Sequence, residues 1–124
     1  MQVAATRNTI TGGINMILVK KDAGFPEQAP GHYQWMGKVK LVAGKDTKHS
    51  RFIISHFLPD GGTEPGSAPG ELIYFCLAGK VKLKSGGQEG ELEPGDTVYI
   101  PPGEVREFKT VGFETAVILC VYNP

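Results

Sequence analysis

The chain has 124 residues, which fits one domain with one hydrophobic core. Hydrophobic residues make up 40% of it and charged residues 21%, as in ordinary soluble globular proteins. Thirteen basic residues balance thirteen acidic ones, so no net charge attracts nucleic acid or an anionic membrane. We therefore predict a single domain over residues 1–124, with no nucleic-acid or membrane partner.

The N-terminal residues and the cysteines indicate a compartment. The opening Met-Gln-Val-Ala-Ala-Thr-Arg lacks the basic region and apolar run of a signal peptide. No apolar run approaches the length of a membrane span. Cys76 and Cys120 both fall within apolar runs, which favours buried free thiols over a disulfide. We expect a cytoplasmic protein.

Glycine and proline divide the chain into short apolar runs, and no amphipathic helix of ten or more residues is visible. Residues 14–20 form the first predicted strand, after Gly12-Gly13. Segment 23–37 contains Gly24, Pro26, Pro30 and Gly31. It is predicted as a long loop that carries Phe25, Tyr33, Trp35 and Met36. Residues 38–43 alternate lysine with apolar residues, as in a half-buried strand.

The second half of the chain continues the pattern of short strands and tight turns. Residues 60–70 are rich in glycine and proline and are predicted as a loop. The other predicted strands are 51–58, 72–77, 80–84, 89–92, 97–100, 105–110 and 114–122. Nine short strands without helices predict an all-β fold, a jelly roll of two packed antiparallel sheets.

Two stretches between residues 58 and 108 carry a recognisable glycine and proline skeleton. In the first, Gly61-Gly62 is followed after a loop and an apolar run by Gly79. In the second, Gly95 precedes Pro101 and Gly103 at fixed spacing. This skeleton resembles the two motifs of the cupin family. The resemblance implies a cupin-like jelly-roll β-barrel, commonly a homodimer, with room for one small molecule in its mouth.

The metal ligands of the family pattern are replaced in this chain. Leu72 stands at the glutamate position, Gly66 and Ala68 (or Pro65 and Ser67 with the longer spacing) at the first two histidines, and Arg106 at the last histidine. Two histidines at i and i+2 on a strand serve a metal because both side chains leave the same face. Leucine, glycine and alanine offer no lone pair, and arginine brings a fixed positive charge. We therefore expect no metal and no other cofactor here.

Strand alternation places other side chains beside these positions. Leu72, Tyr74 and Cys76 share one face of their strand, and Glu104, Arg106 and Phe108 share another. The predicted cavity is mostly apolar, with one cation and one phenol. The candidate ligand-binding residues are Glu71, Leu72, Cys76, Glu104, Arg106 and Phe108.

Arg106 has two interpretations. A guanidinium fork in the cavity would anchor the carboxylate or phosphate of a small molecule. Alternatively, Arg106 forms an ion pair with Glu71, Glu104 or Glu107, or is simply exposed.

The candidate catalytic residues are His56 and Tyr74. His56 lies two residues before the end of a predicted strand, and an inward imidazole would serve as an acid or base. An outward His56 would be a polar residue on the wet face, and the apolar pair Ile53-Ile54 leaves the side open. His32 and His49 fall in predicted turns, which favours surface positions. A displaced metal site from His56, His49, Glu64 and Glu71 is an alternative without support from spacing.

Three functions remain open from the sequence. The first is a metal-independent protein that binds a small molecule through Arg106, as a sensor, carrier or accessory protein. The second is a cupin-type isomerase, lyase or oxygenase with a metal-free or displaced site. The third is a structural or partner-binding domain whose barrel is filled by Leu72 and Phe108. A homodimer is expected from the resemblance, and because the aromatic segment at 25–36 needs a cover.

Overall fold

The computed structural model describes residues 8, 9 and 16–124, and in these residues it contains strands and no helix. Residues 8 and 9 form a short strand, β1. The strands are β1 (Asn8–Thr9), β2 (Ile17–Leu18), β3 (Phe25–Pro26), β4 (His32–Leu41), β5 (Arg51–Thr63), β6 (Glu71–Ala78), β7 (Val81–Ser85), β8 (Gln88–Leu92), β9 (Thr97–Ile100), β10 (Arg106–Thr110) and β11 (Ala116–Asn123). The predicted all-β fold is confirmed. The described part of the chain contains no helix long and apolar enough to cross a membrane.

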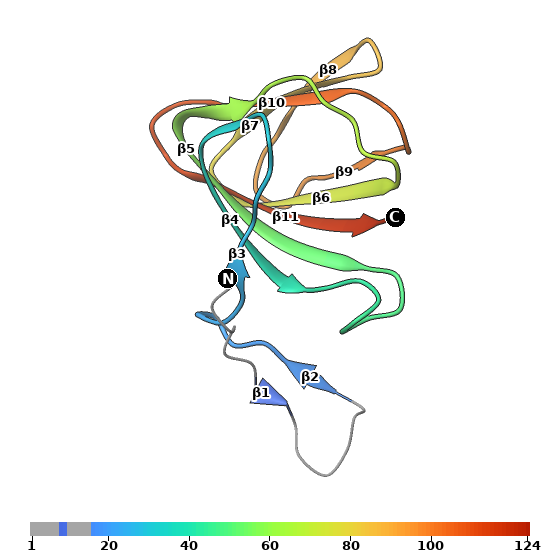
Figure 1. Cartoon of the computed structure of the whole chain (residues 1–124). Coiled ribbons are helices and arrows are strands. Elements are labelled where there is room, and N and C mark those ends of the chain that lie inside the picture. Colours follow the sequence, from blue (N-terminus) through green and yellow to red (C-terminus); the bar gives the residue numbers. More distant parts are fainter. Residues whose placement is uncertain (1–7, 10–15) are drawn as a thin grey trace.

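One antiparallel sheet winds into a barrel (Figure 1). Its order is β8-β7-β10-β5-β11-β6-β9, and β4 also pairs with β5 and carries β3 on its far side. The long strand β5 pairs with β11 along its first half and meets β10 near its end, so it passes from one wall of the barrel to the other. The end strands β8 and β9 are not paired with each other. β1 and β2 form a separate two-stranded ribbon.

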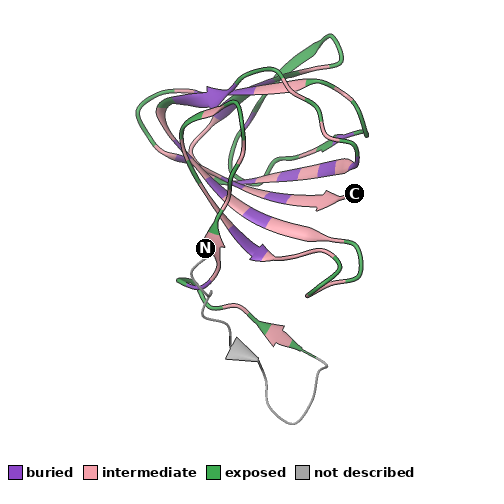
Figure 2. Ribbon diagram, in the orientation of Figure 1, coloured by how far each residue is buried: buried purple, intermediate pink, exposed green. Residues whose placement is uncertain are grey.

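The core lies inside the barrel, and every second residue of the middle strands contributes to it. The side chains of Ile53, Phe57, Tyr74, Cys76 and Ile118 are buried, whereas their strand neighbours are partly exposed. Figure 2 shows this as purple bands along the strands. A period of two is what a pleated strand with one face in a core requires. Cys76 and Cys120 are buried free thiols, as predicted.

The predicted loop over 23–37 is wrong, because β3 and the first half of β4 lie within it. Phe25 and Trp35 pack against the barrel's own core, so they need no second chain to cover them. The alternation along β4 is broken at Gln34, whose φ is 47° and where the pairing with β5 shifts register. Such a bulge turns successive side chains out of phase and hides a strand from a period-two pattern.

The predicted loop over 60–70 is also wrong in part, because β5 continues to Thr63. Its glycines serve close packing of backbones. A Cβ on Gly61 would lie 2.4 Å from the Gln34 carbonyl oxygen, and one on Gly62 would lie 2.3 Å from that of Phe108. These contacts leave no room for a side chain. The two glycines therefore allow neighbouring strands to approach closely, and they do not form a turn. Of the predicted strand 14–20, only Ile17–Leu18 is a strand among the described residues, and residues 14 and 15 lie outside them.

Candidate functional site

A cavity of about 150 Å³ lies inside the barrel, between the inward faces of β4, β5, β6, β10 and β11. Four predicted residues line it: Leu72, Tyr74, Arg106 and Phe108. Ala68 lines it as well, and Gly66 is bonded to Arg106. The structure thus brings together the four positions that match the family's metal ligands when the shorter spacing is used for the first motif. They are Gly66, Ala68, Leu72 and Arg106.

Arg106 is half-buried and is held by neutral groups. Its Nε donates a hydrogen bond to the Tyr74 hydroxyl at 3.1 Å, and Nη1 donates to the Gly66 carbonyl at 2.8 Å. The backbones of Arg106 and Gly66 also exchange two hydrogen bonds, of 2.9 and 3.1 Å. Within the described residues, no carboxylate lies within 4.0 Å of this guanidinium. The ion-pair alternative for Arg106 is therefore not what the structure forms.

Tyr74 is buried beside Arg106 and packs edge-on against Phe108, with ring centroids 4.8 Å apart. Burial is the main cause that raises its pKa, to about 12, and Cys120 raises it further while Arg106 opposes the shift. A phenol with this pKa keeps its proton at neutral pH. Tyr74 is therefore placed to orient Arg106 and is a poor base, and a role as an acid stays a prediction.

His32 also lines the cavity, although the sequence placed it in a surface turn. It begins β4, its ring centroid lies 4.5 Å from that of Trp35, and its Nδ1 lies 3.3 Å from the Pro30 carbonyl oxygen. Burial lowers its pKa, the hydrogen bond to Pro30 opposes this, and Arg106 lowers it further. The imidazole is therefore neutral at pH 7. The bulge at Gln34 breaks the alternation along β4. No period-two pattern in the sequence therefore indicated that His32 faces the cavity.

The charges that line the cavity leave one positive charge uncompensated. Arg51 and Glu27 form an ion pair at 2.6 Å and cancel. His32 and Tyr74 are neutral, and burial raises the pKa of the Cys120 thiol to about 12. Among the described lining residues, Arg106 alone supplies net charge. The cavity therefore has the electrostatics of an anion site.

Two predicted residues lie on the wrong side of their strands. His56 points away from the barrel, since its neighbours Ser55 and Phe57 are the buried ones. Glu71 faces outward too, and it accepts hydrogen bonds from the Tyr99 hydroxyl at 3.1 Å and the Asn123 amide at 3.2 Å. Neither reaches the cavity, so His56 is not positioned for acid or base chemistry there. Alternation decides this, since the inward positions of β5 are odd-numbered and those of β6 even-numbered.

Neither Cys76 nor Glu104 lines the cavity, although Cys76 points into the barrel. Cys76 is fully buried, and its thiol lies 3.4 Å from the Ala78 carbonyl oxygen and 3.6 Å from that of Gly79. Cys120 on the neighbouring strand borders the cavity instead. Glu104 belongs to a separate hollow. Cys76 is therefore core, and Glu104 lies outside the predicted site.

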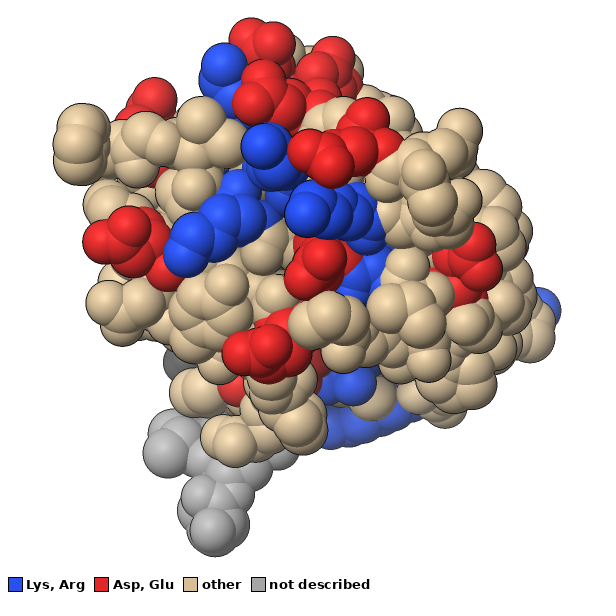
Figure 3. Space-filling view, turned by 90° about the horizontal axis from the view of Figure 1, so that it is seen from above, with Lys and Arg blue, Asp and Glu red and all other residues tan. Residues whose placement is uncertain are grey.

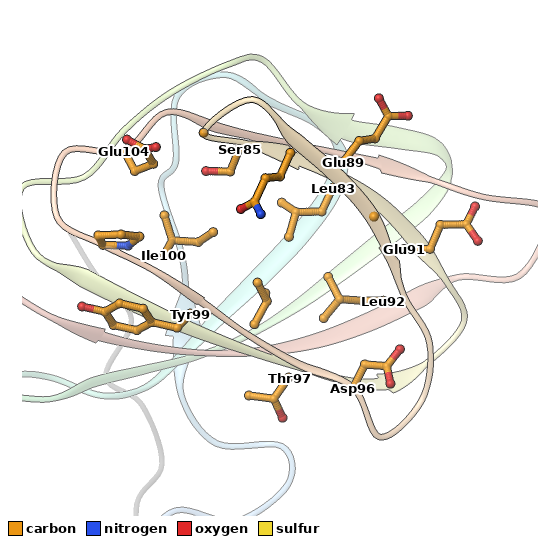
Figure 4. A pocket seen from close by; sticks show the side chains of 15 residues that line it. Leu83, Ser85, Glu89, Glu91, Leu92, Asp96, Thr97, Tyr99, Ile100 and Glu104 are labelled. Carbon is orange, nitrogen blue, oxygen red and sulfur yellow. The ribbon is translucent and has the colours of Figure 1, made fainter.

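The separate hollow, about 450 Å³, opens between β8 and β9, which are not paired with each other (Figure 4). Leu83, Leu92 and Ile100 form its apolar floor, and its carboxylates are Glu89, Glu91, Asp96 and Glu104. It is larger than the barrel cavity, but none of the residues that match the family's ligand positions lines it. The barrel cavity is therefore the candidate functional site.

The residues present do not fit a metal. Leu72 and Ala68 have no donor atom, and Arg106 brings a cation to the position of the last histidine. No cluster of three His, Cys, Asp or Glu side chains in the described part of the chain has the geometry to hold a metal ion. For the displaced site, His49 and Glu64 are exposed, and His56 and Glu71 face out of the barrel.

The profile of the Cupin domain family matches residues 53–122, which is more than half of the chain. The chain belongs to the cupin family. The match begins in β5 and ends in β11, so it includes every strand of this cupin's cavity wall except β4. An uncharacterised protein of Methanocaldococcus jannaschii is 33% identical over 54 residues, which are 44% of this chain and 43% of that protein. The match thus spans less than half of that relative.

Several solved structures resemble most of this chain in fold. The polyketide cyclase RemF of Streptomyces resistomycificus superposes with a TM-score of 0.76 at 23% identity, over 87% of this chain and 79% of that one. A cupin-like protein of Thermotoga maritima gives a TM-score of 0.71 at 22% identity, over 81% and 77% of the two chains. A predicted oxalate decarboxylase of the same organism gives 0.70 at 20% identity, over 79% and 90%. At these identities the likeness shows the fold alone.

Proposed function

We propose that this cupin binds a small anionic molecule in the barrel cavity, with Arg106 as the anchor. One observation carries the proposal: the half-buried guanidinium is held by a phenol and a carbonyl, without a carboxylate partner among the described residues. A partly buried cation without an opposite charge beside it is costly, and an anion entering the cavity reduces that cost. The second arginine of the cavity is already paired, so Arg106 is the one available to a ligand.

The size of the cavity limits the ligand. A volume of about 150 Å³ is well below the range of drug-sized sites and equals that of a cavity that holds one benzene ring. Around it stand the rings of His32, Trp35, Phe57 and Phe108. We therefore propose a small carboxylate with a compact apolar body, of roughly six to nine non-hydrogen atoms. A guanidinium fork matches a carboxylate through two parallel hydrogen bonds.

The proposal is tested by thermal unfolding with a panel of small carboxylates and inorganic phosphate, followed by calorimetric titration of the compounds that bind. A ligand at about one hundred times its Kd adds about 2.7 kcal/mol to the free energy of unfolding. For a chain of this size that raises Tm by roughly 10 °C. We expect Arg106→Met to abolish the shift, and Lys84→Met, which removes an exposed charge on β7, to keep it. If no compound shifts Tm, or if Arg106→Met binds as wild type, the proposal fails and a filled, non-binding barrel takes its place.

His32 supports a second candidate, proton-transfer catalysis on the bound anion. His32 lines the cavity, and a proton on Nδ1 donated to the Pro30 carbonyl leaves Nε2 of the neutral ring as an acceptor. Such a base would take a proton from a C–H bond next to the anchored carboxylate and return it to the same carbon. The test is NMR of a bound carboxylate in D₂O. Exchange of that C–H in wild type and its loss in His32→Gln would support catalysis, whereas binding without exchange would limit the protein to binding.

A further inference from the structure

Ser55 is a polar residue among the inward side chains that β5 contributes to the cavity. The inward residues on either side of it are Ile53 and Phe57, and Ser55 itself is 8% exposed. The residue opposite on β11 is the fully buried Ile118. An apolar side chain of similar size would suit this position equally well, because the surrounding core is apolar. The hydroxyl is therefore explained by what it binds and not by packing.

The Ser55 hydroxyl has no hydrogen-bond partner among the described residues. By contrast, the buried hydroxyl of Thr63 accepts a hydrogen bond from the Phe108 amide at 3.0 Å. The hydroxyl of Thr110 also lacks a partner within the described part of the chain, but Thr110 does not line the cavity. Ser55 does line it, so a molecule in the cavity can reach its hydroxyl. A buried hydroxyl without a partner is unfavourable, and a ligand that supplies one removes this penalty.

Ser55 and Arg106 face the cavity from opposite walls of the barrel. β5 begins in the wall that contains β11 and β6, whereas β10 lies in the other wall beside β7 (Figure 1). The rings of Phe57 and Phe108 meet between the two walls, with centroids 5.7 Å apart. Each ring shares a strand face with Ser55 or Arg106, because side chains alternate along a strand. A ligand whose carboxylate is bound by Arg106 therefore extends across the cavity toward Ser55.

We propose that Ser55 binds a second oxygen of the ligand, so that the ligand is a small carboxylate with a hydroxyl or carbonyl oxygen at the end away from the carboxylate. This inference rests on the proposed function, because Arg106 decides which end of the molecule the carboxylate occupies. A serine hydroxyl both donates and accepts a hydrogen bond, so it suits either kind of oxygen. A purely apolar tail would leave the Ser55 hydroxyl unpaired, and the site therefore discriminates against it.

Charges of both signs share the outer surface of the barrel. Figure 3, which views the molecule from above, shows Lys and Arg interleaved with Asp and Glu. Lys82 of β7 pairs with Glu89 at 3.5 Å, and Lys80, just before β7, pairs with Glu91 at 3.6 Å. This surface is a weak competitor for a small carboxylate, because its positive charges stand beside negative ones. A difference in affinity between two carboxylates that differ by one hydroxyl therefore reports on the cavity.

Calorimetric titration with butanoate, 2-hydroxybutanoate and 4-hydroxybutanoate tests the inference. Wild type is expected to bind 4-hydroxybutanoate roughly five-fold more tightly than butanoate, since one net hydrogen bond is gained. The 2-hydroxy isomer, whose hydroxyl lies beside the carboxylate, should gain less. Ser55→Ala should lose the preference for 4-hydroxybutanoate. Thr110→Val, which removes a buried hydroxyl outside the cavity, is the matched control and should keep it.

Thermal unfolding without ligand gives a second readout. Because the Ser55 hydroxyl is unpaired, Ser55→Ala should keep or raise Tm. Thr63→Val removes a hydroxyl that accepts a hydrogen bond, and it should lower Tm by roughly 4 °C. A purely structural role of Ser55 would instead lower Tm in Ser55→Ala and leave the affinities unchanged.

Several outcomes overturn the inference. No preference for 4-hydroxybutanoate in wild type, an equal gain for the 2-hydroxy isomer, or the same preference in Ser55→Ala would show that Ser55 does not bind the remote oxygen, while binding by Arg106 stands. A Tm in unliganded Ser55→Ala as low as that of Thr63→Val would mean that the hydroxyl already has a partner, such as an ordered water. If none of the three compounds binds, the inference also fails, and Arg106→Met with the wider panel of carboxylates decides the proposed function separately.

Discussion

Arg106 donates a hydrogen bond from Nε to the hydroxyl oxygen of Tyr74 at 3.1 Å, across the cavity wall from β10 to β6. This bond and the one from Nη1 to the Gly66 carbonyl fix the plane of the guanidinium. The fork is thus oriented before any ligand arrives, which reduces the entropy that binding costs. The two residues form one unit, in which Tyr74 positions the group that binds.

Tyr74→Phe is expected to weaken binding of a small carboxylate by roughly five-fold, because a net hydrogen bond contributes about 1 kcal/mol. The loss should be much smaller than that of Arg106→Met, since the charge remains. Calorimetric titration of both variants with the same carboxylate measures the difference. Equal losses in the two variants would show that Tyr74 contacts the ligand directly.

The stability of the protein should fall at alkaline pH because of Tyr74. Burial raises its pKa to about 12 in the folded state, against an ordinary value of 10.0. Between these two values the unfolded chain releases the phenol proton and the folded chain keeps it, so stability is lost as pH rises from about 10 toward 12. The full difference amounts to about 3 kcal/mol. Urea unfolding from pH 8 to 11.5 should show a shallower decline in Tyr74→Phe than in wild type. Parallel declines would contradict this origin.

His32 should lower the stability of the protein at acidic pH. Burial lowers its pKa below the ordinary 6.5, with Arg106 acting in the same direction. Below pH 6.5 the unfolded chain therefore binds a proton that the folded chain refuses, and stability is lost as pH falls. We expect His32→Gln to reduce the slope of stability against pH between 6.5 and 5. Urea unfolding at each pH measures the slope, and a slope in His32→Gln equal to that of wild type would contradict this origin.

Lys40 and Lys38 on β4 form a matched pair for testing which side chain holds the turn at residues 20–23 against β4. The Lys40 ammonium is buried and donates to three carbonyls at 2.6 to 3.0 Å, whereas Lys38 donates to one carbonyl, that of Asp22, at 3.3 Å. Lys40→Met should cost about 1–3 kcal/mol, because it removes three hydrogen bonds, of which the one to the Ala23 carbonyl is buried. Lys38→Met should cost less than about 0.5 kcal/mol. Chemical denaturation measures both losses of stability, and equal losses would disprove the idea that Lys40 holds the turn.

Gly79, which closes the first cupin motif, should resist substitution for two reasons. Its φ is +69°, and an added Cβ would lie 2.6 Å from Ala116 Cα, a backbone atom that cannot turn away. Gly112 shares a positive φ of +81° but has no atom within 4 Å of an added Cβ. Gly112→Ala should therefore cost only the conformational strain of about 1 kcal/mol. Gly79→Ala should cost clearly more, and thermal unfolding of the two variants measures the difference. A similar Tm for both would show that β11 shifts to make room.

The sequence predicted the part of the site that depends on local pattern. Leu72 and Tyr74 on β6, and Arg106 and Phe108 on β10, share faces because side chains alternate along a strand. Their place around the cavity follows from that period and from the glycine and proline skeleton. The interpretation that every metal-ligand position is replaced also comes from residue spacing, and it stays a prediction. Glu71 was predicted to bind the ligand, although alternation places it on the face opposite to its neighbour Leu72, and that prediction was wrong.

Only the tertiary structure showed which other side chains reach the cavity and what net charge the cavity has. His32 and Trp35 reach the cavity through a strand that a bulge at Gln34 conceals, and a bulge shows itself only against its partner strand. His56 follows two isoleucines, so both sides of β5 were equally apolar in sequence, and the pairing with β11 placed it outside. The net charge of the cavity depends on the pairing of Arg51 with Glu27, 24 residues apart. Sequence thus determined which residues share a strand face, and the barrel determined which faces meet, because contacts between distant strands are set by closure of the sheet.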